Sequence, residues 1–168
     1  MFLKRSCLIA LSVFITMFVA ACGSSTTTGG SPYGTGSPST VIQTASVSVK
    51  GQSEMVLTDA HGKTLYYYTL DSATQPTCSS SCAQLWHPLL FTGSGEPSSA
   101  TPLAGKLSVQ MDANGAQVEY NGHPLYTFSK DTAPGQANGE GLFGMWFVVT
   151  PNLAVQGGGS TSGGGYGY

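Results

Sequence analysis

The sequence predicts a mostly β fold, a single compact domain built from two pseudo-symmetric repeats that each contain a β-hairpin. The first reason is a duplicated stretch, Tyr66 to Asp71 and Tyr126 to Asp131, in which a Tyr, an aromatic residue and an Asp recur in the same spacing. The second is that the apolar runs are short, rich in β-branched and aromatic residues, and separated by turn signals. The third is that only 8% of residues are charged, whereas surface helices normally carry many charges.

The first 22 residues have the pattern of an export signal. Lys4 and Arg5 precede an apolar run over residues 6–20, which is short for a membrane-spanning helix and suits a signal peptide. The run ends in Val19-Ala20-Ala21-Cys22, which resembles the lipobox of bacterial lipoproteins. We therefore expect cleavage before Cys22 and a lipid on its thiol. The alternative is an uncleaved anchor helix with an incidental cysteine.

The ends of the chain predict flexible segments around one folded domain. Residues 23–40 contain Gly, Ser and Thr with two Pro, one Tyr and no charge, which is typical of a flexible linker. The Gly-rich end predicts disorder, with the alternative that Tyr166 and Tyr168 adhere to a cell-wall polymer. The predicted organisation is a signal peptide (1–21), the lipidated Cys22 with its linker (22–40), the two-repeat β domain (41–152, repeats about 55–91 and 115–150) and the tail (153–168).

Within the domain, corresponding strands are expected in both repeats. The alternating and apolar runs predict strands over 47–50, 54–58 and 63–70, then over 107–111, 116–120 and 123–128. Asn121-Gly122 is a strong hairpin signal between the last two. Segments 86–91 and 146–150 are expected to close the repeats, and 79–85 is weakly helical in pattern. Because each repeat is small, we expect the two to share a core.

The duplicated motif supplies the candidate site. Side chains alternate between the faces of a strand, so the motif aromatics should share one face while Leu65 and Leu125 occupy the other. Our interpretation is structural: the aromatics pack between the repeats, and each Asp accepts backbone N–H bonds from the following turn. The alternative is that each Tyr–Asp pair belongs to a small polar binding site. The candidate residues are Tyr66, Tyr68, Asp71, Trp86, Tyr126, Phe128, Asp131 and Trp146.

These motifs, together with the lipobox and the cysteines of the first repeat, resemble the secreted-repeat lipoproteins of bacteria. The repeat of that family corresponds here to about residues 62–89 and 122–149. The family is generally described as of unknown function, so the resemblance implies an extracytoplasmic location and a repeat architecture but no catalytic residues. The second repeat departs from the first because Asn138 and Leu142 stand opposite Cys78 and Cys82.

Cys78 and Cys82 are the cysteines that remain after processing and lipidation. In an oxidising compartment we expect them to form a disulfide, with a redox-active pair as the alternative. The three histidines show no metal-binding spacing, and no serine lies in a Gly-x-Ser-x-Gly elbow. The sequence therefore predicts no metal, no cofactor and no catalytic residue.

The expected function follows from location more than from chemistry. Removal of the signal leaves four basic against eight acidic residues, so phosphate neutralisation in a nucleic acid is not expected. We expect a non-enzymatic module that is anchored in the lipid bilayer through Cys22 outside the cytoplasm. It would bind an envelope component or partner protein, or play a structural role. The alternative is a redox or electron-transfer accessory that uses a metal or its Tyr and Trp residues.

Overall fold

The computed structural model describes residues 40–157. The predicted signal peptide, Cys22 and residues 158–168 lie outside the described residues, as does the predicted linker up to residue 39. Strands dominate the described part, confirming the predicted β class, and they form three small sheets. Within residues 40–157, none of the helices has the length and apolar character needed to cross a membrane.

The first sheet is built on a long hairpin, β1 (Thr40–Val49) with β2 (Gln52–Asp59). Its two-residue turn, Lys50-Gly51, has φ of 49° and 82°, the left-handed conformation that tight hairpins require. β5 (Ser98–Ser99) pairs with the start of β1 in parallel. The prediction of a strand over 47–50 was too short, because the earlier part of β1 carries mostly polar side chains and gives little periodic signal.

A second hairpin repeats this arrangement in the other half. It consists of β6 (Leu107–Asp112), β7 (Gly115–Tyr120) and the short β8 (His123–Pro124). Asn121 and Gly122 have φ of 52° and 79°, which confirms the predicted tight turn. The predicted strand over 123–128 is in fact two strands, because residues 123–124 pair with β7 whereas residues 126–128 join a different sheet.

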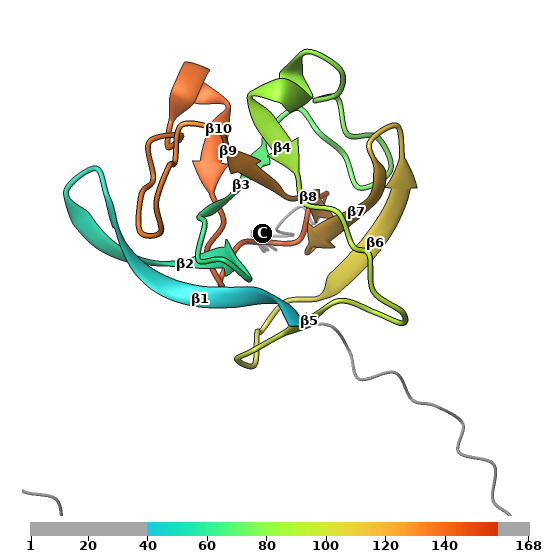
Figure 1. The fold of residues 1–168 in the computed structure, drawn as a ribbon, viewed down its shortest axis with the longest axis horizontal. Helices are drawn as coiled ribbons and strands as arrows, with labels where there is room; N and C mark the ends of the chain where they lie inside the picture. The colour runs from blue at the N-terminus through green and yellow to red at the C-terminus, as the bar shows by residue number, and fades with distance from the viewer. Residues whose placement is uncertain (1–39, 158–168) are drawn as a thin grey trace, which may run out of the picture. The chain divides into compact units, whose positions relative to one another are not determined.

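The third sheet joins the two repeats. Its order is β10 (Trp146–Val148), β3 (Leu65–Tyr68), β9 (Tyr126–Phe128) and β4 (Trp86–Pro88), all antiparallel. Each of its three pairings brings together strands from different repeats. The closing strand of each repeat is thus exchanged onto the motif strand of the other. Figure 1 shows these four short strands beside the two longer hairpins.

The shared core has two parts, one on each side chain face of the motif strands. One cluster is rich in aromatic residues and includes Tyr66 and Tyr126, while the other includes Leu65 and Leu125. This confirms the predicted sorting of faces. The aromatic cluster contains Val47, Val49, Val56, Tyr66, Cys78, Trp86, Tyr126, Phe128, Trp146 and Val148. The other contains Ile42, Leu57, Leu65, Phe91, Val118, Tyr120, Leu125 and Val149.

Other predicted boundaries were too wide. Strand β3 covers only residues 65–68 of the predicted 63–70, and the closing strands β4 and β10 end at Pro88 and Val148. After β4 the chain continues with separate backbone bonds, from Leu89 N to the carbonyl of Leu125 between β8 and β9 and from Phe91 N to the carbonyl of Ala116 on β7. The weakly helical segment is one 3-10 turn, η1 (Cys82–Gln84), and its counterpart η2 (Leu142–Gly144) was not predicted.

Because every pairing of the third sheet joins the two repeats, we expect neither repeat to fold alone. Cutting the exposed loop between Gly93 and Ser94 gives fragments 40–93 and 94–157. Each fragment alone should lack the circular dichroism of packed aromatic rings, and mixing the two should restore it. The fragments should also elute together in gel filtration. A single fragment with native-like aromatic signals would contradict the exchanged topology.

Candidate functional site

The two motif tyrosines lie opposite each other at the centre of the third sheet. Tyr66 on β3 is in register with Tyr126 on β9, and both side chains are fully buried. Each hydroxyl crosses to the other repeat. Tyr66 donates to Asp131 Oδ2 at 2.6 Å, and Tyr126 donates to Asp71 Oδ2 at 2.7 Å. The motif therefore forms two reciprocal hydrogen bonds between the repeats.

One signal in the sequence could have revealed this crossing. Within a repeat the Asp lies five residues after the Tyr, and an extended strand rises about 3.3 Å per residue. A Tyr and the Asp of its own repeat are thus too far apart along the strand for a direct bond. Only an antiparallel pairing of the two motif strands brings a carboxylate to each hydroxyl.

The second oxygen of each carboxylate holds the loop that follows its own strand. Asp71 Oδ1 accepts hydrogen bonds from Thr77 N at 2.6 Å and Thr77 Oγ1 at 2.8 Å. Asp131 Oδ1 accepts one from Asn138 N at 2.9 Å. This confirms that the aspartates accept backbone N–H bonds, although the donors lie six and seven residues along the chain. Each Asp therefore connects its own loop to the other repeat.

The electrostatics of these pairs follow from burial. Asp71 is 6% exposed and Asp131 is fully buried. Burial, and then the adjoining carboxylate, raises the pKa of Tyr66 and Tyr126 well above the ordinary value for a phenol. Both tyrosines therefore remain protonated hydrogen-bond donors.

The remaining motif residues form an aromatic stack over the tyrosines. Trp86 and Trp146 lie face to face, with ring centroids 3.8 Å apart and planes inclined by 2°. Tyr68 stacks on Trp146 at 4.4 Å, and Phe128 stacks on Trp86 at 4.3 Å. Tyr66 meets Trp86 edge-on at 5.3 Å. The corresponding edge-on contact in the other repeat, Tyr126 with Trp146, measures 5.2 Å. The structure thus brings all eight candidate residues into one region.

The loops that carry the two aspartates are held in place by different means. In the first repeat Cys78 and Cys82 are bonded, with Cα atoms 5.2 Å apart, and Cys78 is buried in the aromatic cluster. In the second repeat Glu140 takes a bracing role, because its Oε2 accepts a bond from Val148 N at 2.8 Å. Its Oε1 lies 3.3 Å from Lys50 Nζ. The predicted disulfide pairing is supported, and its stability to redox exchange stays a prediction.

The backbone carbonyls of the two aspartates also have unlike partners. Lys63 Nζ donates to the carbonyl of Asp131. At the carbonyl of Asp71 the donor is Gln156 Nε2, at 2.7 Å. The sequence analysis placed Gln156 in the tail, yet residues 153–156 belong to the folded part, where Asn121 bonds both Leu153 and Gln156. The stretch Leu153-Ala154-Val155-Gln156 is too short for a periodic pattern, so it gave no signal for this contact.

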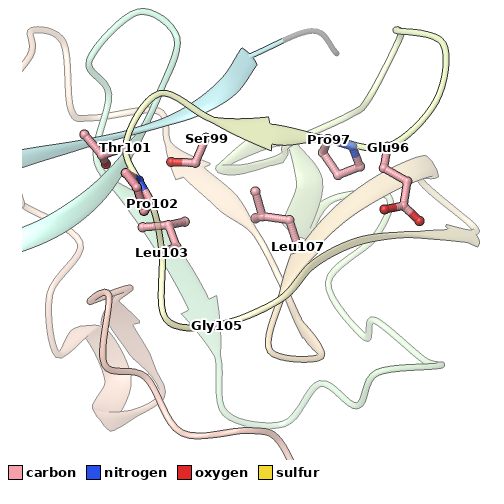
Figure 2. Close-up of a pocket in the computed structure, with 8 residues that line it drawn as sticks. All are labelled: Glu96, Pro97, Ser99, Thr101, Pro102, Leu103, Gly105 and Leu107. Carbon is pink, nitrogen blue, oxygen red and sulfur yellow. The ribbon is translucent and has the colours of Figure 1, made fainter. Parts of the chain in front are cut away.

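The described surface also has a pocket outside the motif, shown in Figure 2. It has a volume of about 320 Å³ and is formed by the loop between the repeats together with the start of β6. Its lining residues are Glu96, Pro97, Ser99, Thr101, Pro102, Leu103, Gly105 and Leu107. Sequence reasoning missed it because this Pro- and Ser-rich segment carries no motif. Among the described residues, no group of three metal-ligating side chains gathers at this or any other place.

The two Tyr–Asp hydrogen bonds between the repeats predict how strongly mutations at these residues should couple in their effect on the free energy of unfolding. Tyr66→Phe and Tyr126→Phe should each lower the free energy of unfolding by about 1.5–3 kcal/mol, the range for a hydrogen bond to a charged group. In a double-mutant cycle measured by urea unfolding, Tyr66→Phe should couple to Asp131→Asn by about 0.5–3 kcal/mol.

The matched control is Tyr66→Phe with Asp71→Asn, the pair within one repeat. These two changes should add to within about 0.5 kcal/mol because the side chains share no bond. Stronger coupling within the repeat than across it would overturn the assignment of the pairs.

Comparison with known families agrees with this architecture. A family model described as a secreted repeat of unknown function matches the chain twice, at residues 48–90 and 108–150. Among curated proteins and among solved structures, nothing matches the chain. The two matched segments contain the duplicated motif, its Trp residues and their strands, which confirms the resemblance drawn from the sequence. The chain therefore belongs to the family of secreted repeats of unknown function.

Proposed function

We propose that this protein is a lipid-anchored, non-enzymatic module outside the cytoplasm that binds an envelope component or a partner protein. The description of the family as secreted supports the extracytoplasmic location. The anchoring rests on the lipobox-like Val19-Ala20-Ala21-Cys22 and on the uncharged segment behind it.

The proposal that the protein is not an enzyme rests on one observation: the polar groups of the motif are already hydrogen-bonded within the protein. All four carboxylate oxygens of Asp71 and Asp131 accept hydrogen bonds from the protein itself. Both tyrosine hydroxyls are buried donors in those bonds. A general acid or base must reach a substrate proton, and these groups are already engaged. The motif thus supports a structural role in holding the repeats together.

We propose that the envelope component or partner protein binds at the pocket shown in Figure 2 and not at the motif. The pocket is formed by the segment between the two family matches, so it lies outside the repeat that the family model describes. Its lining combines two prolines and two leucines with the hydroxyl side chains of Ser99 and Thr101 and the carboxylate of Glu96. Such a lining suits a short peptide or a polymer segment held by shape and a few hydrogen bonds.

The anchoring is tested by replacing the proposed lipidation site. Cys22→Ser should release the protein from membranes into the soluble fraction and prevent its labelling with a radioactive fatty acid. Cys7→Ser, within the predicted signal peptide, is the matched control and should leave both properties unchanged. Membrane retention of the uncleaved Cys22→Ser protein would instead assign residues 6–20 to an anchor helix.

The binding surface is tested by adding the same charge inside and outside the pocket. Thr101 and Thr92 are both exposed residues of the loop between the repeats, and only Thr101 lines the pocket. Envelope material retained by the immobilised protein should be reduced by Thr101→Lys and unaffected by Thr92→Lys. Equal retention by both variants would place binding elsewhere on the surface.

One observation supports electron transfer as a second candidate function. The predicted alternative was an electron-transfer accessory that uses a metal or Tyr and Trp residues. The stacked indoles of Trp86 and Trp146 favour electron transfer through aromatic residues over electron transfer through a metal.

A further inference from the structure

We propose that the aromatic cluster takes up the oxidising equivalent of a one-electron oxidant and holds it as a neutral tyrosyl radical on Tyr66 or Tyr126. The oxidants meant here are freely diffusing radicals of the kind derived from peroxides. This function is independent of the anchoring and binding proposed above.

The stack offers a continuous path for the electron. Tyr68, Trp146, Trp86 and Phe128 follow one another at centroid distances of 4.4, 3.8 and 4.3 Å. Trp and Tyr are the side chains that lose an electron most readily, and three of these four rings are of those types. Tyr68 is partly exposed at one end of the stack, while both indoles are buried. An oxidant in solution can therefore remove an electron at Tyr68, and the hole can then move inward.

The tyrosines below the stack are equipped to lose a proton together with the electron. Oxidation of a phenol releases its proton, and Asp131 Oδ2 already receives that hydrogen bond from Tyr66 at 2.6 Å. Asp71 stands in the same relation to Tyr126 at 2.7 Å. In the step that we propose, the phenol O–H bond breaks, its proton forms an O–H bond on the carboxylate, and one electron reduces the neighbouring indole radical cation to the neutral indole. The tyrosine ends as a neutral radical, the aspartate as a neutral acid, and the external oxidant has gained one electron.

Burial makes this end state favourable. Before the step, the pair contains one carboxylate charge in the core, and after it the pair is uncharged. A low-dielectric interior disfavours the charged form of a group, so removal of that charge lowers the cost of oxidising the tyrosine. An exposed phenol loses its proton to water and gains nothing from this effect. The hole should therefore settle on Tyr66 and Tyr126 and not on tyrosines nearer the surface.

The chain provides a matched control on the same strand. Tyr67 lies on the opposite side of β3, where it packs against His123 and Phe147 and takes no part in the stack. Replacing Tyr67 with Phe removes one phenol without touching the proposed path. Replacing Tyr66 and Tyr126 with Phe removes the two radical sites but keeps both rings.

The test uses the full mature chain with a photogenerated ruthenium(III) polypyridyl complex as the one-electron oxidant. Electron paramagnetic resonance of rapidly frozen samples should show a tyrosyl radical in the wild type and in Tyr67→Phe. In the Tyr66→Phe/Tyr126→Phe double variant that signal should be lost, and a tryptophan radical should take its place. Survival of the tyrosyl signal in the double variant, or its loss in Tyr67→Phe, would overturn the proposal.

The role of the carboxylates is tested separately, with folding checked by circular dichroism. Asp71→Asn/Asp131→Asn keeps the side-chain shape but removes the proton acceptor, so most of the tyrosyl signal should disappear although both tyrosines remain. An unchanged yield would refute the proton transfer. If that variant does not fold, the wild type decides, because coupled proton transfer requires slower radical formation in D₂O, and equal rates in H₂O and D₂O would refute the step.

Discussion

The hydrogen bond from each motif tyrosine to the aspartate of the other repeat is the interaction on which the fold depends. A carboxylate inside a protein is destabilising unless donors surround it. The Asp131 carboxylate receives one donor from its own loop and one from Tyr66, so half of the hydrogen bonds to this carboxylate come from the other repeat. Separating the repeats would leave both carboxylates and both hydroxyls without these partners. Formation of either repeat is therefore linked to formation of the other.

The exchanged strands follow from the same constraint. For both hydroxyls to reach across, the two motif strands must run antiparallel with Tyr66 opposite Tyr126. That register places the closing strands on the outer edges of the sheet, where β10 pairs with β3 and β4 pairs with β9. The tryptophans that begin those closing strands then meet at the pseudo-twofold axis, which accounts for their nearly parallel stacking. Hydrogen bonding, strand order and aromatic packing are thus three results of one geometry.

Much of this architecture could be predicted, because a duplication gives the same signal twice. The offset between the repeats identified the residues that meet in the core, and the alternation of strand side chains separated Leu65 from Tyr66. The hydrogen-bond partner of each tyrosine was harder to predict, because both repeats contain an Asp at the same position of the motif. The distance along an extended strand decides which Asp each tyrosine bonds. Composition and periodicity give no information about that distance.

The features that escaped prediction share a physical character. The first half of β1 pairs with β2 and buries Ile42, and residues 153–156 bond to Asn121 and Asp71 while Leu153 packs on the same core cluster. Each segment buries too few apolar side chains to produce a periodic pattern. The pocket between the repeats likewise arises from the course of a loop and not from a motif. Local sequence patterns depend on buried side chains that recur at regular spacing, whereas these segments are fixed by individual hydrogen bonds and single apolar contacts.

The differences between the two repeats show which features the duplicated motif does not require. The bond to each aspartate is preserved in both halves, whereas the surrounding loops have diverged, with a disulfide in one and Glu140 in the other. The tip of the second loop places Phe143 at φ 55°, a conformation that is costly for a bulky residue, and leaves its side chain 75% exposed. The corresponding position in the first repeat is Ala83. The motif that the two repeats share joins them to each other. Membership in the family therefore tells us how the chain folds. The partner recognition that we propose would then depend on the segments that the duplication does not share.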